Sequence, residues 1–241
     1  MCFSVNVNLV KEELEKRFDA TLIDRDKYRP SYYYHAFAIP ELPVICSEEP
    51  SEIRLLKWGL IPSSTFDMTQ ANDIRMKTFN ARAESIDTKQ SFSSSFGSKR
   101  CLVPVKGFYE WQHNGNKKTP WYIYHSENEI ISLAGLYDSW TESSTGEIYS
   151  TFTIITTEAN DLLAEIHNSA KRMPVILDRL YERQWISKDA SDADLKEILR
   201  PYPSGILAAH TIGPLVNDKY ADRNTPDVIK PYTYYSQQSL F

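Results

Sequence analysis

The spacing of hydrophobic residues predicts helices near the N-terminus and in the last third of the chain. Leu9, Leu14 and Phe18 fall on one helical face, and lysine and glutamate fill the other. Thr157 is a suitable N-cap for a later helix that has acidic residues in its first turn. Ser191, followed three residues later by an aspartate, begins another in a capping-box pattern. The helices expected cover residues 9–18, 158–167, 178–187 and 191–200.

Apolar runs bounded by turn residues predict strands through the middle of the chain. Short strands and turns are expected over 31–62, followed by strands at 102–105, 108–111, 121–124, 130–136 and 149–156. Asn114-Gly115 is typical of a tight hairpin turn, and the serine-rich stretch 87–99 indicates a loop or frayed helix. Strands and helices do not alternate regularly, and neither a repeat nor a linker divides the chain. The pattern therefore favours a single α+β domain with mainly antiparallel strands over a doubly wound sheet.

The composition is that of a globular protein. The chain has 241 residues, of which 41% are hydrophobic and 24% charged, which excludes a disordered or coiled-coil protein. Cys2, Cys46 and Cys101 form neither a disulfide framework nor a Cys-x-x-Cys metal clip, which suits a reducing compartment. No signal peptide or membrane-spanning stretch is apparent, so we expect a soluble cytoplasmic protein. The five histidines lack the spacing of metal ligands, so no metal or other cofactor is expected.

Charge is distributed unevenly along the chain. The formal net charge of −5 argues against a nucleic-acid partner. Residues 75–118, however, contain nine lysines and arginines against three acids, a local charge of +6 that leaves −11 for the rest. A basic surface near an exposed aromatic such as Trp58 would suit single-stranded nucleic acid. The alternative is a basic face that pairs with acidic helices elsewhere in the protein.

Cys2 has the most unusual position of the candidate residues. Methionine aminopeptidases remove Met1 when residue 2 is small, and the chain would then begin with a cysteine bearing a free α-amine and a thiol. Amine pKa values near 8 and thiol pKa values near 8.5 leave a reactive fraction of each at neutral pH. Such a 1,2-aminothiol condenses with an aldehyde to an imine, which the thiol closes to a five-membered thiazolidine. The alternative is a small buried hydrophobic residue at the start of a strand.

Four other polar residues are candidates for a site. Asn80 can orient a nucleophile, and Arg82 can grip a phosphate or carboxylate, although this cluster by itself better fits a surface loop with an internal salt bridge. Glu110 stands between Tyr109 and Trp111, where desolvation would raise its pKa, unless it faces solvent across a half-buried strand. His167 ends a predicted helix, as a simple cap or as a proton donor.

The order of these residues along the chain resembles the SRAP family, the SOS-response-associated peptidase-like proteins that shield abasic sites in single-stranded DNA. The resemblance covers residues 1–231, followed by a Tyr-rich tail at 232–241. Six ordered motifs carry it: Met1-Cys2, Trp58-Gly59-Leu60-Ile61-Pro62, Asn80-Ala81-Arg82-Ala83-Glu84, Arg100-Cys101-Leu102-Val103-Pro104 with Gly107-Phe108-Tyr109-Glu110-Trp111, Ala134-Gly135-Leu136-Tyr137, and Ile166-His167 with Arg172-Met173-Pro174-Val175-Ile176-Leu177.

The resemblance implies a role for each candidate. Cys2, exposed by removal of Met1, would form a thiazolidine with the C1′ aldehyde of a ring-opened abasic sugar. Glu110 would move protons during imine formation and sulfur addition, and His167 would help open the sugar. Asn80 would hold Cys2, and Arg82 would grip a flanking phosphate. The resemblance also implies self-cleavage of the initiator residue, an SOS-type DNA-damage role, and lyase- or protease-like chemistry.

Trp58 and Arg172 complete the expected DNA-binding set, and the expected fold has a barrel-like antiparallel core with flanking helices. The partner would be single-stranded DNA containing an abasic site, bound by a monomer. The family usually begins Met-Cys-Gly-Arg, whereas Phe3 and Ser4 follow Cys2 here, and His167 lies further from Arg172 than the family spacing. Two other functions remain open: an N-terminal-nucleophile cysteine peptidase, and a non-catalytic module that binds modified DNA.

Overall fold

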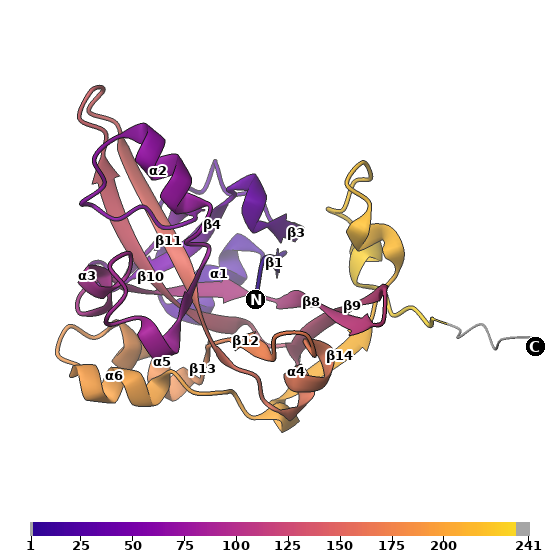
Figure 1. Cartoon of the computed structure of the whole chain (residues 1–241). Helices are drawn as coiled ribbons and strands as arrows, with labels where there is room; N and C mark the ends of the chain where they lie inside the picture. Colours follow the sequence, from indigo (N-terminus) through magenta and orange to yellow (C-terminus); the bar gives the residue numbers. More distant parts are fainter. Residues whose placement is uncertain (1, 235–241) are drawn as a thin grey trace, which may run out of the picture.

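Five strands close into a barrel at the centre of the molecule (Figure 1). The structure, a computed structural model, describes residues 2–234. Antiparallel pairing runs from strand to strand around the barrel, and a short parallel pairing of the last strand with the first closes it. In this order the strands are β11 (Ile148–Glu158), β10 (Ile131–Thr141), β7 (Arg100–Val105), β4 (Glu41–Cys46) and β5 (Glu52–Trp58). The predicted α+β class with a barrel-like antiparallel core is confirmed.

Short strands extend the barrel at its edges. β2 (Thr21–Leu22) pairs with β5, β13 (Ile176–Leu177) pairs with β10, and both β6 (Asn80–Arg82) and β12 (Arg172–Pro174) pair with β11. The last two matter for function, because the same strand β11 holds the segments that carry Asn80 and Arg172.

A second, antiparallel sheet lies beside the barrel and carries the start of the chain. Its strands follow the order β14 (Leu207–Thr211), β9 (Lys117–His125), β8 (Gly107–Asn114), β1 (Ser4–Val7) and β3 (Ser31–His35). The hairpin between β8 and β9 pairs Asn114 with Lys117, so its loop is Gly115 and Asn116, one residue later than predicted. Gly115 has a φ of 60°, which is the conformation that glycine adopts without strain.

The helices cover the outside of the sheets. They are α1 (Lys11–Phe18), α2 (Met68–Arg75), α3 (Ser93–Phe96), α4 (Asp161–Ile166), α5 (Arg179–Ile186) and α6 (Asp192–Ile198). Single 3₁₀ turns occur at η1 (Ala36–Ala38), η2 (Ala83–Ser85), η3 (Ser204–Ile206), η4 (Pro214–Asn217) and η5 (Pro226–Ile229). The four predicted helices correspond to α1, α4, α5 and α6, and α3 is the short helix in the serine-rich stretch. The sequence analysis did not predict α2.

Two of the expected helix caps have different outcomes. Ser191 caps α6 as predicted, since its hydroxyl accepts a hydrogen bond from the Asp194 amide at 3.2 Å. The prediction for Thr157 was wrong, because β11 continues through Glu158. Asn160 caps α4 instead, and its side chain accepts from the Leu163 amide at 2.9 Å. Pairing with β12 extends the strand past the point at which the sequence pattern ended it.

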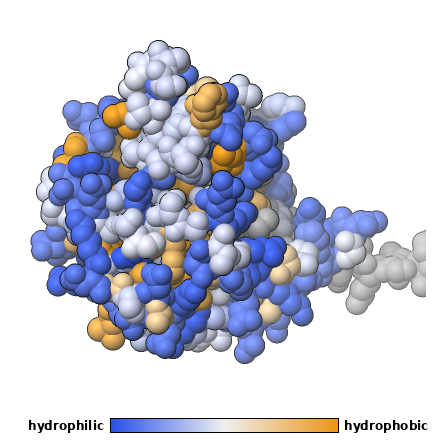
Figure 2. Space-filling view, turned by 60° about the vertical axis from the view of Figure 1, so that its left-hand side comes forward, coloured by the Kyte–Doolittle hydropathy of each residue, from blue (hydrophilic) through white to orange (hydrophobic). Residues whose placement is uncertain are grey.

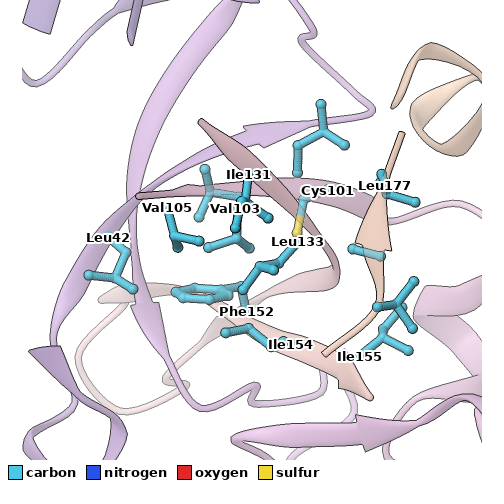
Figure 3. Close-up of a cluster of buried hydrophobic side chains, with 14 of the residues drawn as sticks. Leu42, Cys101, Val103, Val105, Ile131, Leu133, Phe152, Ile154, Ile155 and Leu177 are labelled. Atoms are coloured by element: carbon cyan, nitrogen blue, oxygen red, sulfur yellow. The ribbon is translucent and has the colours of Figure 1, made fainter. Parts of the chain in front are cut away.

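Side chains of the barrel strands fill the space that they enclose. Figure 3 shows Leu42 of β4, Val103 of β7, Leu133 of β10, and Phe152 and Ile154 of β11 gathered in one cluster, and all five side chains are fully buried. Every residue of β7 is buried, on both of its faces, because the helices and the second sheet cover the outside of the barrel. A strand covered on both sides does not show a hydrophobic and polar alternation.

The basic segment at 75–118 does not form one basic surface. Arg75 and Arg100 are buried, and the Arg100 guanidinium donates to four backbone carbonyls from α3, α5 and their flanking residues. Lys77, Lys99 and Lys106 form ion pairs with carboxylates. The local charge of +6 therefore overstates the positive charge that this segment offers to a ligand, and part of the segment follows the alternative in which it pairs with acids elsewhere.

The face of the molecule in Figure 2 is mostly hydrophilic, with apolar side chains in small separate groups. Within the described residues, no helix has the length and apolar character needed to cross a membrane. At the C-terminal end of these residues, Tyr232 and Tyr234 pack against each other and bond to Thr211 and Ile212. The first residues of the predicted tail at 232–241 are thus attached to β14, and the part beyond residue 234 lies outside the described residues.

Candidate active site at the start of the chain

Cys2 is buried at the beginning of the second sheet. Its side chain has no solvent exposure, and its Sγ lies 4.0 Å from the Ser4 carbonyl oxygen. The following strand β1 lies between β8 and β3, so the two neighbours enclose the start of the chain. Burial, and then the nearby charge of Glu110, raise the pKa of the Cys2 thiol far above its ordinary value. The thiol is therefore protonated at rest and needs a base before it can act as a nucleophile.

Asn80 holds the backbone of Cys2. Its side-chain amide donates to the Cys2 carbonyl oxygen at 2.9 Å. Asn80 reaches this position because β6 pairs in parallel with β11, with Asn80 opposite Ile154. The side-chain oxygen of Asn80 is buried and accepts no hydrogen bond from the described part of the chain. The predicted contact between Asn80 and Cys2 is thus present, and an acceptor remains available beside it.

Glu110 is a buried carboxyl group on β8. It is 3% exposed, and burial raises its pKa from 4.5 to about 7. The alternation argument would have placed it on a solvent face, but residues 107–110 of β8 are buried on both faces. The alternative of a solvent-facing glutamate is therefore excluded. At neutral pH both protonation states are populated, which is the condition that suits a group acting as acid and base.

His167 faces Glu110 from the end of α4. Its Nε2 lies 3.9 Å from Glu110 Oε2, and its Nδ1 lies 2.9 Å from the Arg172 carbonyl oxygen. Because a carbonyl oxygen only accepts, Nδ1 carries the hydrogen in the neutral ring, and the lone pair of Nε2 points toward Glu110. Burial lowers the pKa of His167, so the ring is neutral at pH 7. The residue is both the helix cap and a neighbour of the buried carboxyl group.

The longer spacing between His167 and Arg172 is absorbed by a tight turn. The Lys171 amide donates to the His167 carbonyl oxygen at 2.8 Å. Lys171 has a φ of 48°, in the left-handed region, which reverses the chain and returns it to β12. Although more residues separate His167 from Arg172 than in the family pattern, the turn places the imidazole of His167 beside the backbone of Arg172.

Cys2, Asn80, Glu110 and His167 thus lie together, and two of them are buried groups that can carry a proton. A protonated thiol, a carboxyl group with a pKa of about 7 and a neutral imidazole lie in a largely water-free environment. Cys46 and Cys101 are also buried, and their thiol pKa values are raised by burial. Among the interactions described, no asparagine side chain bonds to the backbone of either cysteine, and the glutamate near Cys46, Glu48, is exposed rather than buried. The arrangement suits nucleophilic chemistry at Cys2 assisted by general acid and base groups.

The three predicted DNA-binding residues have different environments. Arg82 is exposed on β6, and none of the described carboxylates forms an ion pair with it. Arg172 is instead held by Glu84, with a guanidinium–carboxylate distance of 2.5 Å, and by the Thr156 carbonyl oxygen at 2.6 Å. Its charge is thus already paired inside the protein.

The expectation of an exposed Trp58 was wrong. Its side chain has no solvent exposure, its indole stacks beside Phe152, and its Nε1 donates to the Phe79 carbonyl oxygen at 2.8 Å. Closure of the barrel places β5 against β11 and buries the ring. Trp58 therefore supports the backbone just before Asn80 and cannot stack on a base.

The sequence analysis missed an exposed aromatic group near the site. Phe37 is 49% exposed, and its ring contacts Phe3 and Phe79, the residues next to Cys2 and Asn80 in the sequence. The alternation of rings at positions 33, 35 and 37 was the signal that could have revealed it. For metal binding, residues 2–234 contain no group of three His, Cys, Asp or Glu side chains that could hold an ion.

Comparisons with known proteins agree on one family. The family model described as SOS response associated peptidase (SRAP) matches residues 1–219. The abasic site processing protein YoqW of Bacillus subtilis is 36% identical over 208 residues, which span 86% of this chain and 88% of YoqW. The abasic site processing protein HMCES of Xenopus tropicalis is 31% identical over 233 residues, covering 85% of this chain and 67% of HMCES.

Solved structures show the same fold. A crystal structure of a protein from Bacteroides thetaiotaomicron superimposes with a TM-score of 0.90 at 33% identity, over 96% of this chain and all of that one. A protein from Bordetella bronchiseptica shares the fold at 24% identity, with a TM-score of 0.75 over 88% of this chain and all of that one.

Proposed function

Because the chain belongs to the SOS response associated peptidase (SRAP) family, whose relatives above are named abasic site processing proteins, we propose that it captures abasic sites covalently. Cys2 forms a thiazolidine with the ring-opened sugar of an abasic site in single-stranded DNA. One observation carries the proposal: the Cys2 backbone is held by Asn80 beside a buried Glu110 that faces His167. No other cysteine in the described residues has this environment.

The first step is opening of the sugar. An abasic sugar exists mainly as a closed hemiacetal, and its ring oxygen must gain a proton while the C1′ hydroxyl loses one. Glu110, with a pKa of about 7, supplies a proton to Nε2 of His167 as the two groups approach from 3.9 Å. His167 then protonates the ring oxygen, and the carboxylate of Glu110 accepts the hydroxyl proton. The products are a 4′-hydroxyl and a free aldehyde.

The second step joins Cys2 to the aldehyde. The α-amine of Cys2 adds to C1′, and Glu110 protonates the departing hydroxyl, so that an imine and one water form. The thiol then adds to the imine carbon, and its proton passes to the imine nitrogen through Glu110. The sum is aldehyde plus aminothiol giving thiazolidine plus water, with no oxidant or reductant. It requires a free amine at Cys2, hence removal of Met1, which lies outside the described residues.

The covalent product would preserve the DNA strand. A free aldehyde acidifies the neighbouring C2′ hydrogens and promotes β-elimination of the 3′ phosphate, whereas the thiazolidine carbon is saturated. The burial of Cys2 also limits access of water to the new ring. A reversible contact would offer protection only while the complex persisted.

A denaturing gel tests the proposal. The protein is incubated with a single-stranded oligonucleotide carrying one abasic site and then heated in detergent. We expect an adduct with a mass equal to protein plus DNA less one water, and none with a tetrahydrofuran analogue, which cannot form an aldehyde. Absence of an adduct with the abasic strand contradicts the proposal. Catalytic turnover of peptides would support the peptidase alternative, and salt-sensitive binding without an adduct would support a non-covalent DNA-binding module.

We expect Arg82→Ala to weaken DNA binding and to flatten its salt dependence. Each phosphate contact releases counterions, and its loss reduces the slope of log K against log salt by about 0.7 for a single strand. The measurement is equilibrium binding of the tetrahydrofuran oligonucleotide at several salt concentrations. Arg179→Ala is the matched control, because Arg179 is an exposed arginine on α5. An unchanged slope in Arg82→Ala would show that Arg82 makes no phosphate contact.

A further inference from the structure

A row of aromatic rings begins beside the Cys2 site. Tyr33 and His35 lie on one side of β3, and the ring of Phe37 in the following 3₁₀ turn packs beside that of His35. The ring centroids of Tyr33 and His35 are 6.2 Å apart with nearly parallel planes, and those of His35 and Phe37 are 5.3 Å apart. We call these three residues the aromatic row. Phe37 is its most accessible member, with 49% of its surface exposed.

The inner end of the row is tied to the backbone around Cys2. The Phe37 ring lies 5.4 Å from the Phe3 ring and 5.0 Å from the Phe79 ring. The Phe3 carbonyl oxygen accepts from the Ala36 amide at 2.8 Å and lies 3.0 Å from Nδ1 of His35. In Figure 1, β3 lies next to β1 near the start of the chain. The aromatic row is therefore attached to the residue that directly follows Cys2 and to the residue that directly precedes Asn80.

The outer end of the row carries a positive charge. The Arg223 guanidinium carbon lies 4.3 Å above the centre of the Tyr33 ring. No carboxylate within residues 2–234 forms an ion pair with Arg223, in contrast to Arg172 at the other side of the site. On its inner side, the Tyr33 ring packs against Tyr109 in an edge arrangement, which fixes its orientation. The row is therefore a set of positioned rings that ends at a cation.

This combination matches the chemistry of a single nucleic-acid strand. Aromatic rings bind unpaired bases by stacking, whatever their sequence, and arginine binds the phosphates that join them. A folded protein partner would gain from the apolar Phe37 ring, but it would not need several rings in succession leading to an unpaired arginine. A small molecule would need an enclosed cavity, whereas the row lies along a strand.

We propose that the aromatic row binds the nucleotides on one side of the abasic site, with the first flanking base stacked on Phe37 and Arg223 on a more distant phosphate. The inference rests on the proposed function, because Cys2 fixes where the abasic sugar lies. The inference also assigns a role to Phe3, which stands where the family usually has glycine. The ring of Phe3 packs against the ring of Phe37 and holds it in position. Base stacking thus holds the nucleotide on one side of the abasic site, and Arg82 contacts the phosphate on the other side.

Fluorescence of 2-aminopurine tests this arrangement without the covalent step. Two single-stranded oligonucleotides carry a tetrahydrofuran site, with 2-aminopurine directly 5′ of it in one and directly 3′ in the other. We expect binding to quench the fluorescence of only one of the two by stacking. Phe37→Ala should remove that quenching and weaken binding by about tenfold, within the range of base stacking on aromatic residues. Phe37→Trp should restore both.

The control is Leu180→Ala, which removes an exposed hydrophobic side chain from α5 and should leave binding and quenching unchanged. Thermal unfolding checks that each variant is folded. Equal binding and quenching by Phe37→Ala and the wild type would overturn the inference, as would an absence of quenching on both sides. Adduct formation with a true abasic strand is measured separately. If the wild type forms that adduct while Phe37→Ala binds normally, this inference fails and the proposed function stands; if no adduct forms, the proposed function fails.

Discussion

Cys2→Ala is expected to abolish the heat-stable adduct with abasic DNA completely. The alanine variant still has an α-amine after Met1 is removed, so it can form an imine with the aldehyde. It has no thiol to close the thiazolidine, and water hydrolyses the imine when the protein is denatured. The measurement is the denaturing gel with the single-stranded abasic oligonucleotide, compared over the same time course as the wild type.

Borohydride separates the contributions of the amine and the thiol. Reduction traps an imine, so it should produce a stable crosslink for Cys2→Ala but should be unnecessary for the wild type. Cys46→Ala is the matched control, because Cys46 is also a buried thiol but lies on β4 in the barrel. Mass spectrometry of the purified proteins establishes whether Met1 has been removed. An undiminished, unreduced adduct in Cys2→Ala would refute the role of the thiol.

Glu110→Gln is expected to slow adduct formation by a factor of about 10² to 10⁴, the usual contribution of a general acid or base. Glutamine retains the shape of the side chain but cannot release or accept the proton. The wild-type rate should peak near pH 7, where the protonated and ionised forms of Glu110 are both abundant, since its pKa is about 7. The rate of the variant should lose this dependence. The measurement is the single-turnover rate between pH 5 and 9, and an unchanged rate profile would exclude Glu110 as the proton carrier.

The same substitution is expected to stabilise the protein at alkaline pH. Burial raises the pKa of Glu110 from 4.5 to about 7, so the folded protein binds this proton more tightly than the unfolded chain does. The contribution to the free energy of unfolding is full below pH 4.5 and is lost as the pH rises through 7. Each pKa unit corresponds to 1.36 kcal/mol, so ionisation of Glu110 lowers the free energy of unfolding by about 3 kcal/mol. Glutamine cannot ionise, so the variant does not undergo this loss of unfolding free energy.

Urea unfolding at pH 4 and pH 8 tests this consequence. Relative to the wild type, Glu110→Gln should gain free energy of unfolding between the two pH values, by up to about 3 kcal/mol. Equal differences at both pH values would show that the carboxyl group is not destabilised by burial. A variant that is slower in forming the adduct and more stable at pH 8 would show that the site keeps an unfavourable buried charge for its chemistry.

The sequence by itself determined the family, and it supplied the candidate residues of the site. Cys2, Asn80, Glu110 and His167 were each candidates by residue type, and the order of the motifs united them through the family resemblance before their contacts were known. The sequence also predicted α1, α4, α5 and α6, though not α2, because most helix signals are local: the α6 cap at Ser191 depends only on residues within one turn. The cap predicted at Thr157 was wrong because pairing of β11 with β12, a contact between distant segments, extended the strand.

Only the tertiary structure decided which of these side chains face solvent. Closure of the barrel buried Trp58, and packing on both faces of β8 buried Glu110 and raised its pKa. Among the described residues, three of the nine basic residues in this segment form ion pairs, and Lys99 and Lys106 do so with Asp138 and Glu13, partners that the sequence does not place beside them. The aromatic row beside Cys2 also exists only because β3 pairs with β1. Burial and charge pairing are set by contacts between distant parts of the chain, so local patterns selected the candidate residues but could not assign their environments.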